Sequence, residues 1–344
     1  MESAEISNGS ARSAVVLNDT SGRNHHGCSR VMRILRSGLE SRGIRVSATA
    51  PAHSDWARNE AFLGALEAAD LIVINGEGTL HHGRPGGARL LEVVRHAARR
   101  APVALINAQW QQNPAAWGAL LAGCALISAR DHRSADEMRA AQDTVAVRMV
   151  PDLSLSETEA VSDDPRNRLL FGDSVRWGTR RALAHAARRV GADALLPTKT
   201  LPGAAWRLPV LSAGLAAAYH GTLPFGMPPM ILARNEDDYL RQLATARMHI
   251  TGRFHGICLS MVSRTPFLAV GSNSKKIEAL LQDAGLSQDR LLTPEALATI
   301  GREDLERPIT EPELASLSEY LARARIEAGQ LFDDLAALAK GKKA

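Results

Sequence analysis

Apolar residues recur along the chain in two alternating patterns, short continuous runs and longer stretches with helical spacing. Runs such as residues 13–18, 71–75 and 103–107 are typical of strands that are buried on both faces. Between such runs, stretches like residues 30–40 carry apolar side chains three and four positions apart, which predicts amphipathic helices. The alternation therefore predicts an α/β fold with a parallel sheet covered by helices.

The alternation stops once and then restarts. Residues 154–167 are polar and acidic with a proline, which predicts a linker between a Rossmann-like domain over residues 1–153 and a second one over residues 168–310. A length of 344 residues agrees with two domains. Residues 311–344 have helical spacing and are candidates to return to the N-terminal domain, whereas the Pro- and Gly-rich residues 197–226 give no assignment. Two such domains bind ligands in the cleft between them.

Composition narrows the class of protein. The formal net charge of +4 is spread along the chain, so we expect no nucleic-acid partner. Cys28, Cys124 and Cys258 are far apart and form no CxxC pair, which indicates neither a zinc ribbon nor a disulfide framework and favours a reducing compartment. There is no apolar leader and no window of about 20 apolar residues. We expect a cytoplasmic protein, for which peripheral contact with the inner membrane stays open.

Four loops that follow predicted strands carry the candidate chemistry. The first, DTSGRNHHGCS, contains Asp19, Asn24, His25 and His26 just before a helix whose N-terminus favours an anion. It lacks the spacing GxGxxG, so it is no nicotinamide-binding loop.

The second loop, NGEGTLHHG, combines Glu77 with His81 and His82. A carboxylate and an imidazole in one loop can serve as general acid and base. Both residue types also bind zinc, but adjacent histidine side chains usually diverge, so we predict no metal site.

The third and fourth loops, SARDHRS and TGRFHG, supply Arg130 and the pair Arg253 and His255. Arginine suits a carboxylate or phosphate because its planar fork donates two parallel hydrogen bonds. His255 adds a titratable imidazole beside a helix start, and Lys275 or Lys276 before the next helix adds positive charge.

At this point the chain resembles the polysaccharide pyruvyltransferase family. The run TGRFHGICLSMVSRTPFLAVGSNSKKIEALLQDAGL resembles the family's C-terminal signature, and LIVINGEGTLHHG, ISARDHRSADEM and LNDTSGRNHHGCSRVMRILRSGLESRG resemble its Gly-rich loop, its Arg-Asp segment and its N-terminal element. The resemblance spans residues 15–286 and is weakest over 155–235. It implies a GT-B-like fold and the transfer of pyruvate from phosphoenolpyruvate, as a ketal, onto a sugar of a cell-surface polysaccharide or its lipid-linked precursor. Glu77 departs from the family by interrupting its Gly run.

The resemblance also implies roles for individual residues. Arg130, Arg253 and a histidine of the Gly-rich loop align with residues that hold phosphoenolpyruvate or assist proton transfer, as does His255. Together with the loop chemistry, the resemblance predicts that His255, Glu77 and His81 are catalytic. The expected ligands of the donor are Arg130, Arg253, Lys275, Lys276 and His82. The expected ligands of the acceptor are Asp19, Asn24, His25 and His26. No cofactor is expected, since phosphoenolpyruvate is a co-substrate, and the acceptor would be a sugar or a lipid-linked oligosaccharide.

Two other functions fit the same loops. A glycosyltransferase that uses a nucleotide sugar, such as CMP-linked Kdo, also handles a carboxylate, a phosphate and an oxocarbenium-like transition state. The chain has no Asp-x-Asp after a strand, which disfavours a metal-dependent GT-A enzyme. A cell-envelope assembly or polysaccharide-binding protein without activity is the other alternative.

Overall fold

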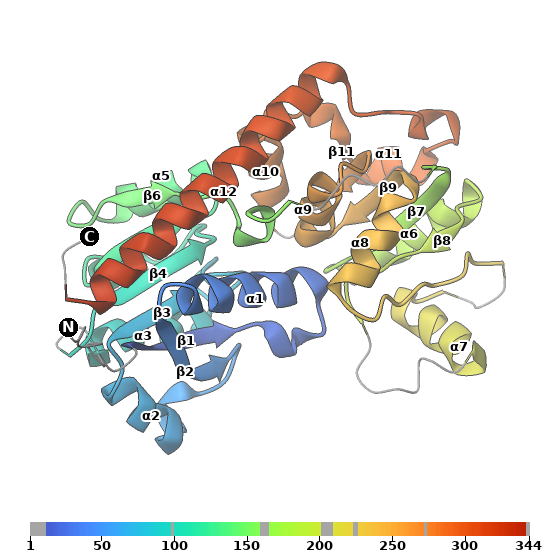
Figure 1. Ribbon diagram of the computed structural model, residues 1–344. Coiled ribbons are helices and arrows are strands. Elements are labelled where there is room, and N and C mark those ends of the chain that lie inside the picture. Colours follow the sequence, from blue (N-terminus) through green and yellow to red (C-terminus); the bar gives the residue numbers. More distant parts are fainter. Residues whose placement is uncertain are drawn as a thin grey trace, which may run out of the picture.

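The computed structural model describes residues 12–97, 100–158, 165–200, 209–222, 226–271 and 274–341. Within them, two parallel sheets form the two halves of the molecule (Figure 1). The first sheet has the order β2-β1-β3-β4-β5-β6. Its strands are β1 (Arg12–Asp19), β2 (Ile44–Pro51), β3 (Leu71–Asn75), β4 (Val103–Ala108), β5 (Leu126–Ala129) and β6 (Val147–Met149).

The second sheet has the order β11-β10-β9-β7-β8. Its strands are β7 (Arg168–Ser174), β8 (Ala194–Leu195), β9 (Ala246–Gly252), β10 (Phe267–Val270) and β11 (Leu291–Leu292). Because the strands within each sheet are parallel, the loops that leave their carboxyl ends gather at one edge of that sheet.

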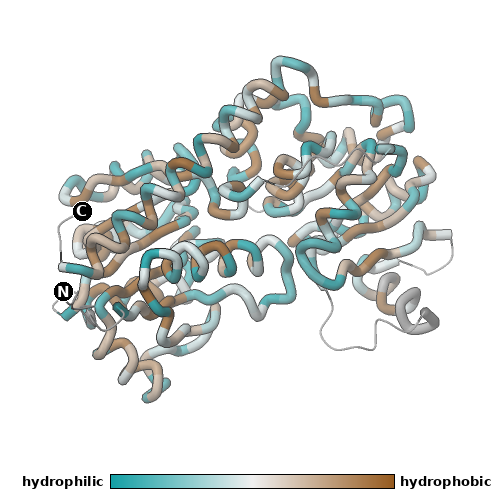
Figure 2. The backbone as a smooth tube through the Cα atoms, in the orientation of Figure 1, coloured by the Kyte–Doolittle hydropathy of each residue, from teal (hydrophilic) through white to brown (hydrophobic). Residues whose placement is uncertain are grey.

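Each sheet has a core on both of its faces. In β1, Val15 and Leu17 pack into one apolar cluster while Ala14 and Val16 pack into the other, because successive side chains of a strand point to opposite faces. The covering helices of the first half are α1 (His26–Glu40), α2 (Glu60–Glu67), α3 (Pro85–Ala97), α4 (Gly118–Leu121) and α5 (His132–Ala141). Those of the second half are α6 (Trp177–Arg189), α8 (Glu236–Ala244), α9 (Phe254–Val262), α10 (Lys276–Asp283) and α11 (Pro294–Thr299), and α7 (Pro209–His220) contacts α6. Figure 2 shows apolar residues concentrated on the strands.

The long helix α12 (Glu311–Ala339) joins the two halves, and it runs across the molecule in red in Figure 1. Its first part places Leu317 and Leu321 in a core cluster with residues of α9 and α10. Further along, Leu331 and Leu335 lie in the cluster formed by α1 and one face of the first sheet. A Thr310 capping box fixes the start of the helix.

The segment expected to link the domains is not a free loop at its start. The 3₁₀ turn Leu153–Leu155 is buried and packs against α1, α9 and α12. Residues 159–164 of the expected linker lie outside the described residues.

Three other differences from the predicted elements concern the second half. Helix α7 forms in the segment that gave no assignment. Residues 230–232 have the short apolar run of a possible strand, but Met230 makes only an isolated bridge to Leu195. The sequence pattern predicts a helix over 238–246 and a strand over 248–251, but α8 ends at Ala244 and Ala246 already begins β9. No helix among the described residues is both long and apolar enough to cross a bilayer.

A candidate active site between the two sheets

A cavity of about 280 Å³ lies between the two halves. Its walls come from the loops that follow strands of both sheets, and the residues lining it are Arg23, His25, Cys28, Glu77, Gly78, His81, Arg84, Arg130, Val175, Lys199, Arg253, Phe254, His255 and Lys276. Seven residues singled out from the sequence therefore meet in one place, namely His25, Glu77, His81, Arg130, Arg253, His255 and Lys276. Arg130 and Arg253, which lie in different halves, both line it.

Three of the expected acceptor ligands lie elsewhere. Asp19 accepts hydrogen bonds from the backbone and hydroxyl of Ser21, which shapes its own turn. The Asn24 carbonyl accepts from the Thr200 backbone, so this residue ties the two halves together. The ring of His26 is buried against Tyr239 at 5.0 Å, and burial lowers its pKa to about 4. These three residues support the fold and do not line the cavity.

Two of the expected donor ligands also lie outside the cavity. His82 is exposed, and its Nδ1 lies 2.8 Å from Nδ1 of His81, so it sits behind the histidine that lines the cavity. Lys275 is exposed at the start of α10, whereas its neighbour Lys276 reaches the cavity. In each pair only one of the two adjacent side chains lines the cavity.

Arg130 follows β5 and is held by three partners. Its Nη1 lies 3.1 Å from Asp152 Oδ2, its Nη2 donates to Gln109 Oε1 at 2.9 Å, and its guanidinium lies 4.1 Å from the centre of the Phe254 ring. Burial alone would raise the pKa of Asp152, but His255 and Arg130 beside it hold that pKa well below its usual range. Both terminal nitrogens of the Arg130 guanidinium therefore already have partners within the protein, which the sequence did not reveal.

Arg253 at the end of β9 has a similar partner in Asp173. Its Nε donates to Asp173 Oδ2 at 2.7 Å, and its Nη2 donates to the Tyr219 hydroxyl at 3.2 Å. Although burial opposes ionisation, Arg253 keeps the pKa of Asp173 well below its usual range. The remaining Nη1 has no hydrogen bond to any described residue and can bind a ligand in the cavity.

The imidazole of His255 lies between two carboxylates. Glu77 Oε1 is 3.7 Å from Nδ1, and Asp152 Oδ1 is 3.6 Å from Nε2. Gly27 of α1 packs so closely against this ring that a Cβ there would lie 2.2 Å from the Cβ of His255. The glycine is what lets the two helices bring their N-terminal residues together.

Glu77 is buried and held by two donors. The Thr20 hydroxyl donates to Oε2 at 2.9 Å, and the Cys28 thiol donates to Oε1 at 2.9 Å. Burial, together with the Glu77 carboxylate, raises the pKa of the Cys28 thiol well above its usual value. The side chains of His25, Cys28 and His255 also offer ligand atoms that all lie within 4.8 Å of one another, so a metal ion could be held here although the sequence predicted none.

Sequence reasoning missed Asp152, Asp173 and Cys28. Asp152 comes shortly after β6, so its place near a carboxyl strand end was a usable signal. Asp173 lies within β7, where its strand position gave no sign that the side chain would face Arg253.

Four more cations surround the cavity: Arg23, Arg84, Lys199 and Lys276. Burial and the nearby Arg130 and Arg253 lower the pKa of Lys276 to about 7. Glu77 is the one carboxylate among the described residues that line the cavity. The site is therefore strongly electropositive and suited to a small anion.

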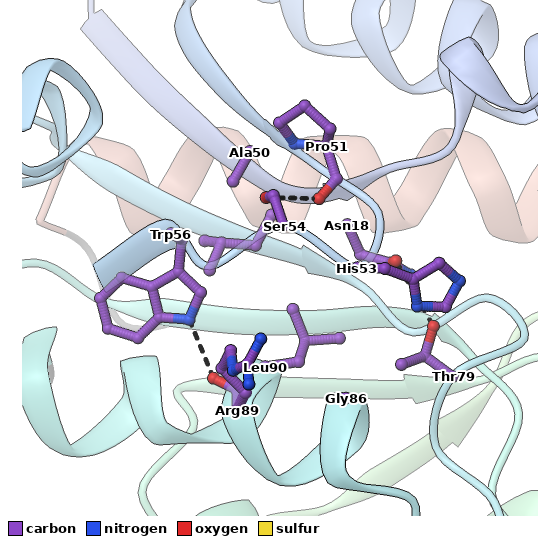
Figure 3. A pocket seen from close by; sticks show the side chains of 11 residues that line it. Asn18, Ala50, Pro51, His53, Ser54, Trp56, Thr79, Gly86, Arg89 and Leu90 are labelled. Carbon is purple, nitrogen blue, oxygen red and sulfur yellow. Dashed lines mark hydrogen bonds between the residues drawn. The ribbon is translucent and has the colours of Figure 1, made fainter. Parts of the chain in front are cut away.

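A second cavity of about 230 Å³ lies beside the first, in the N-terminal half (Figure 3). Trp56, Leu90 and Ala50 supply apolar surface, and Asn18 and His53 are among its polar groups. The Arg23 guanidinium, which lines the first cavity, lies 2.6 Å from Nε2 of His53. This pair forms part of the wall between the two cavities.

One family model matches part of the chain. Residues 215–274 match the family model of the polysaccharide pyruvyl transferases, which confirms the resemblance found in the sequence. The matched segment includes Arg253, His255 and the Tyr219 that contacts Arg253. No curated protein sequence matches significantly.

Solved structures share the fold at low sequence identity. A putative UDP-N-acetylglucosamine 2-epimerase from Listeria monocytogenes has a TM-score of 0.54 and 10% identity, with 96% of this chain and 97% of that chain covered. The UDP-GlcNAc 2-epimerase from Neisseria meningitidis, bound to UDP-GlcNAc, has a TM-score of 0.54 and 8% identity, with 94% and 99% covered. The fold is thus the predicted GT-B-like arrangement of two Rossmann-like halves.

Proposed function

We propose that this protein, a transferase related to the polysaccharide pyruvyl transferases, moves pyruvate from phosphoenolpyruvate onto a sugar of a cell-surface polysaccharide or its lipid-linked precursor as a ketal. One observation carries the proposal. Arg130 and Arg253 come from separate halves and line one small cationic cavity beside the imidazole of His255. The family match over residues 215–274 supports the reaction type.

The charge of the cavity fits the donor. Phosphoenolpyruvate carries about three negative charges on its carboxylate and phosphate, and each is suited to guanidinium and ammonium donors. Because Asp152 and Asp173 already occupy parts of the two arginine forks, we assign most of the donor's charge to Nη1 of Arg253, to Lys276 and to Arg23 and Arg84. Arg130 then acts chiefly by holding Asp152 beside His255.

The reaction needs a proton at the methylene carbon of the donor and the removal of a proton from each of two sugar hydroxyls. His255 gives a proton to the methylene carbon of the donor, which creates an oxocarbenium-like centre at the adjacent carbon. One sugar hydroxyl attacks this carbon while Glu77 takes its proton. Glu77 passes that proton to the phosphate oxygen as the C–O bond to phosphate breaks. The second hydroxyl then closes the ketal and gives its proton to His255, which restores the acid. His81 lies in the same wall and stays a second candidate base; burial lowers its pKa to about 4, so it is neutral at physiological pH.

We further propose that the acceptor sugar occupies the neighbouring cavity of Figure 3. Polar and apolar surfaces meet there, as a pyranose requires, and the loop holding Glu77 and Thr79 borders both cavities. A Cβ added to Gly86 would lie 3.8 Å from its nearest neighbours, so Gly86→Leu should fill the cavity without a clash at its Cβ. In saturation-transfer NMR with a panel of pyranoses, this variant should lose the sugar signal and keep its affinity for phosphoenolpyruvate. An unchanged sugar signal would move the acceptor elsewhere.

A nucleotide-sugar donor is the second candidate. A cavity of about 480 Å³ beside the start of α6 is lined by Arg176, Thr179 and Pro294, among others, and it is large enough to favour a ligand bigger than phosphoenolpyruvate. It lies in the second half, after β10 and at β11.

Thermal unfolding in the presence of each donor separates the two. A ligand at 100-fold its Kd stabilises the folded chain by about 2.7 kcal/mol. We expect phosphoenolpyruvate to raise the Tm of the wild-type chain and CMP or UDP to leave it unchanged, and Arg253→Met should remove the shift. A shift with a nucleotide alone would favour the glycosyltransferase, and no shift with any of the three would favour a protein without activity.

A further inference from the structure

Three potential metal ligands converge at the inner wall of the cavity. His25 and Cys28 stand at the N-terminus of α1, and His255 stands at the start of α9. One ligand atom from each lies within 4.8 Å of the other two, and all three residues are buried. Residues three apart on a helix share one face, and Gly27 allows that face to reach His255.

Two carboxylates stand beside these three residues. Glu77 Oε1 lies 2.9 Å from the Cys28 sulfur and 3.7 Å from Nδ1 of His255, so it borders the same space. On the far side of that ring, Asp152 Oδ1 lies 3.6 Å from Nε2. A carboxylate behind a histidine is the usual support of a metal-bound imidazole, because it fixes the ring's orientation and raises its basicity.

We propose that this cluster binds one zinc ion per chain through Cys28, His25 and His255, with Glu77 as the fourth ligand. One sulfur, two nitrogens and one oxygen are a donor set that zinc accepts in tetrahedral geometry, whereas magnesium and calcium require oxygen ligands. On binding, the Cys28 sulfur forms a bond to zinc and its proton passes to solvent, with no change in oxidation state. The thiolate and the Glu77 carboxylate then balance the two positive charges of the ion.

The site overlaps the groups assigned to pyruvyl transfer. A bound ion would occupy His255 and Glu77, so the zinc-loaded protein should not catalyse the proposed transfer. Zinc would thereby act as an inhibitor of that site. The binding itself does not depend on the transfer reaction, so either proposal can fail without the other.

Cobalt(II) provides a direct probe, because a cobalt–thiolate bond gives a charge-transfer band and tetrahedral cobalt gives intense d–d bands. The full chain is reduced, stripped of metal with a chelator and titrated with cobalt(II), and then zinc is added. We expect both bands to grow to one equivalent of cobalt and to vanish with one equivalent of zinc. Failure of the wild-type chain to bind cobalt, or binding without a thiolate band, would overturn the proposal.

Variants assign the ligands. Cys28→Ser should remove the thiolate band, while Cys124→Ser, a buried cysteine outside the cluster, should keep it. His25→Ala should weaken zinc binding at least tenfold, and Asp152→Asn should weaken it about 10- to 100-fold if Asp152 supports the metal-bound ring. Circular dichroism of each variant reports whether it is folded. Zinc affinity that is the same in folded Cys28→Ser as in the wild type would contradict the assignment.

Discussion

At the scale of single residues, the site is organised by carboxylates that stand behind its cations and its imidazole. His255 lies between Glu77 and Asp152, and Arg253 is paired with Asp173. The two carboxylates lie within 3.7 Å of this buried ring, and Gly27 packs against it, which limits the positions that the ring can take for proton transfer.

Replacement of His255 tests its role in the reaction. We expect His255→Ala to lower turnover by about 10²- to 10⁴-fold, the usual contribution of a general acid, and to leave the affinity for phosphoenolpyruvate nearly unchanged. His185→Ala is the matched control, because this histidine is exposed on α6 and lies outside the cavity. Turnover close to that of the wild type, measured as phosphate release, would remove His255 from the mechanism.

Lys276 should make donor binding depend on pH. Burial and the nearby Arg130 and Arg253 lower its pKa to about 7, while Glu77 and Cys28 act in the opposite direction. Lys276 is therefore charged below about pH 7, and its positive charge is lost as the pH rises through that value. We expect the affinity for phosphoenolpyruvate to fall by up to about tenfold per pH unit above pH 7.

Calorimetric titrations of variants isolate this effect. Lys276→Met should lack this loss of affinity for phosphoenolpyruvate above pH 7. The donor itself titrates in the same way with both proteins, so the difference between their pH profiles reports Lys276. Lys275→Met, at the exposed neighbouring position, should retain it. Equal pH profiles for the wild type and Lys276→Met would show that another group is responsible.

How far the sequence predicts the site depends on the kind of residue. Arg130, Arg253, His255 and Glu77 follow strands with clear apolar runs, so their meeting in a cleft could be predicted. Which of two adjacent residues lines the cavity could not be predicted: His81 and Lys276 line it, whereas His82 and Lys275 do not. That choice depends on local backbone angles, such as the φ of 57° at His82, which a sequence pattern does not specify.

At the scale of elements, close contact between α1 and α9 shapes the site. Gly27→Ala places a methyl group 2.2 Å from the Cβ of His255, so the helices must move apart. We expect a loss of about 1–3 kcal/mol in the free energy of unfolding by urea. Gly22→Ala is the control, since no atom lies within 4 Å of a Cβ there. Equal destabilisation of the two variants would mean that α1 and α9 can move apart at Gly27 without a cost in stability, and would contradict the tight contact described.

Strands β1, β3 and β4 were predictable because each contains a continuous apolar run. The second half was harder. Strands β8 and β11 have only two residues each, and α7 begins directly after a Pro- and Gly-rich stretch that obscures its start. Short strands are fixed by pairing with neighbours, which is a tertiary effect that the local sequence does not carry.

At the scale of the whole molecule, α12 contributes to the cores of both halves. Its buried apolar face should therefore contribute more to the free energy of unfolding than its exposed face. Leu335 is fully buried beside α1, and we expect Leu335→Ala to reduce the free energy of unfolding by about 2–5 kcal/mol. Ile326 is 60% exposed on the same helix, and Ile326→Ala should change it by less than about 0.5 kcal/mol. Urea unfolding measures both, and a similar small effect for the two would contradict the packing described for α12.

The molecule as a whole brings cations from two halves to one small cavity, and the most direct test is a crystal structure of the protein soaked with phosphoenolpyruvate. We predict that the donor lies in the cavity between the sheets, with its anionic groups on Nη1 of Arg253 and on Lys276 and with its methylene carbon facing His255. Donor density at any other place, or an empty cavity in crystals soaked at saturating concentration, would contradict the account.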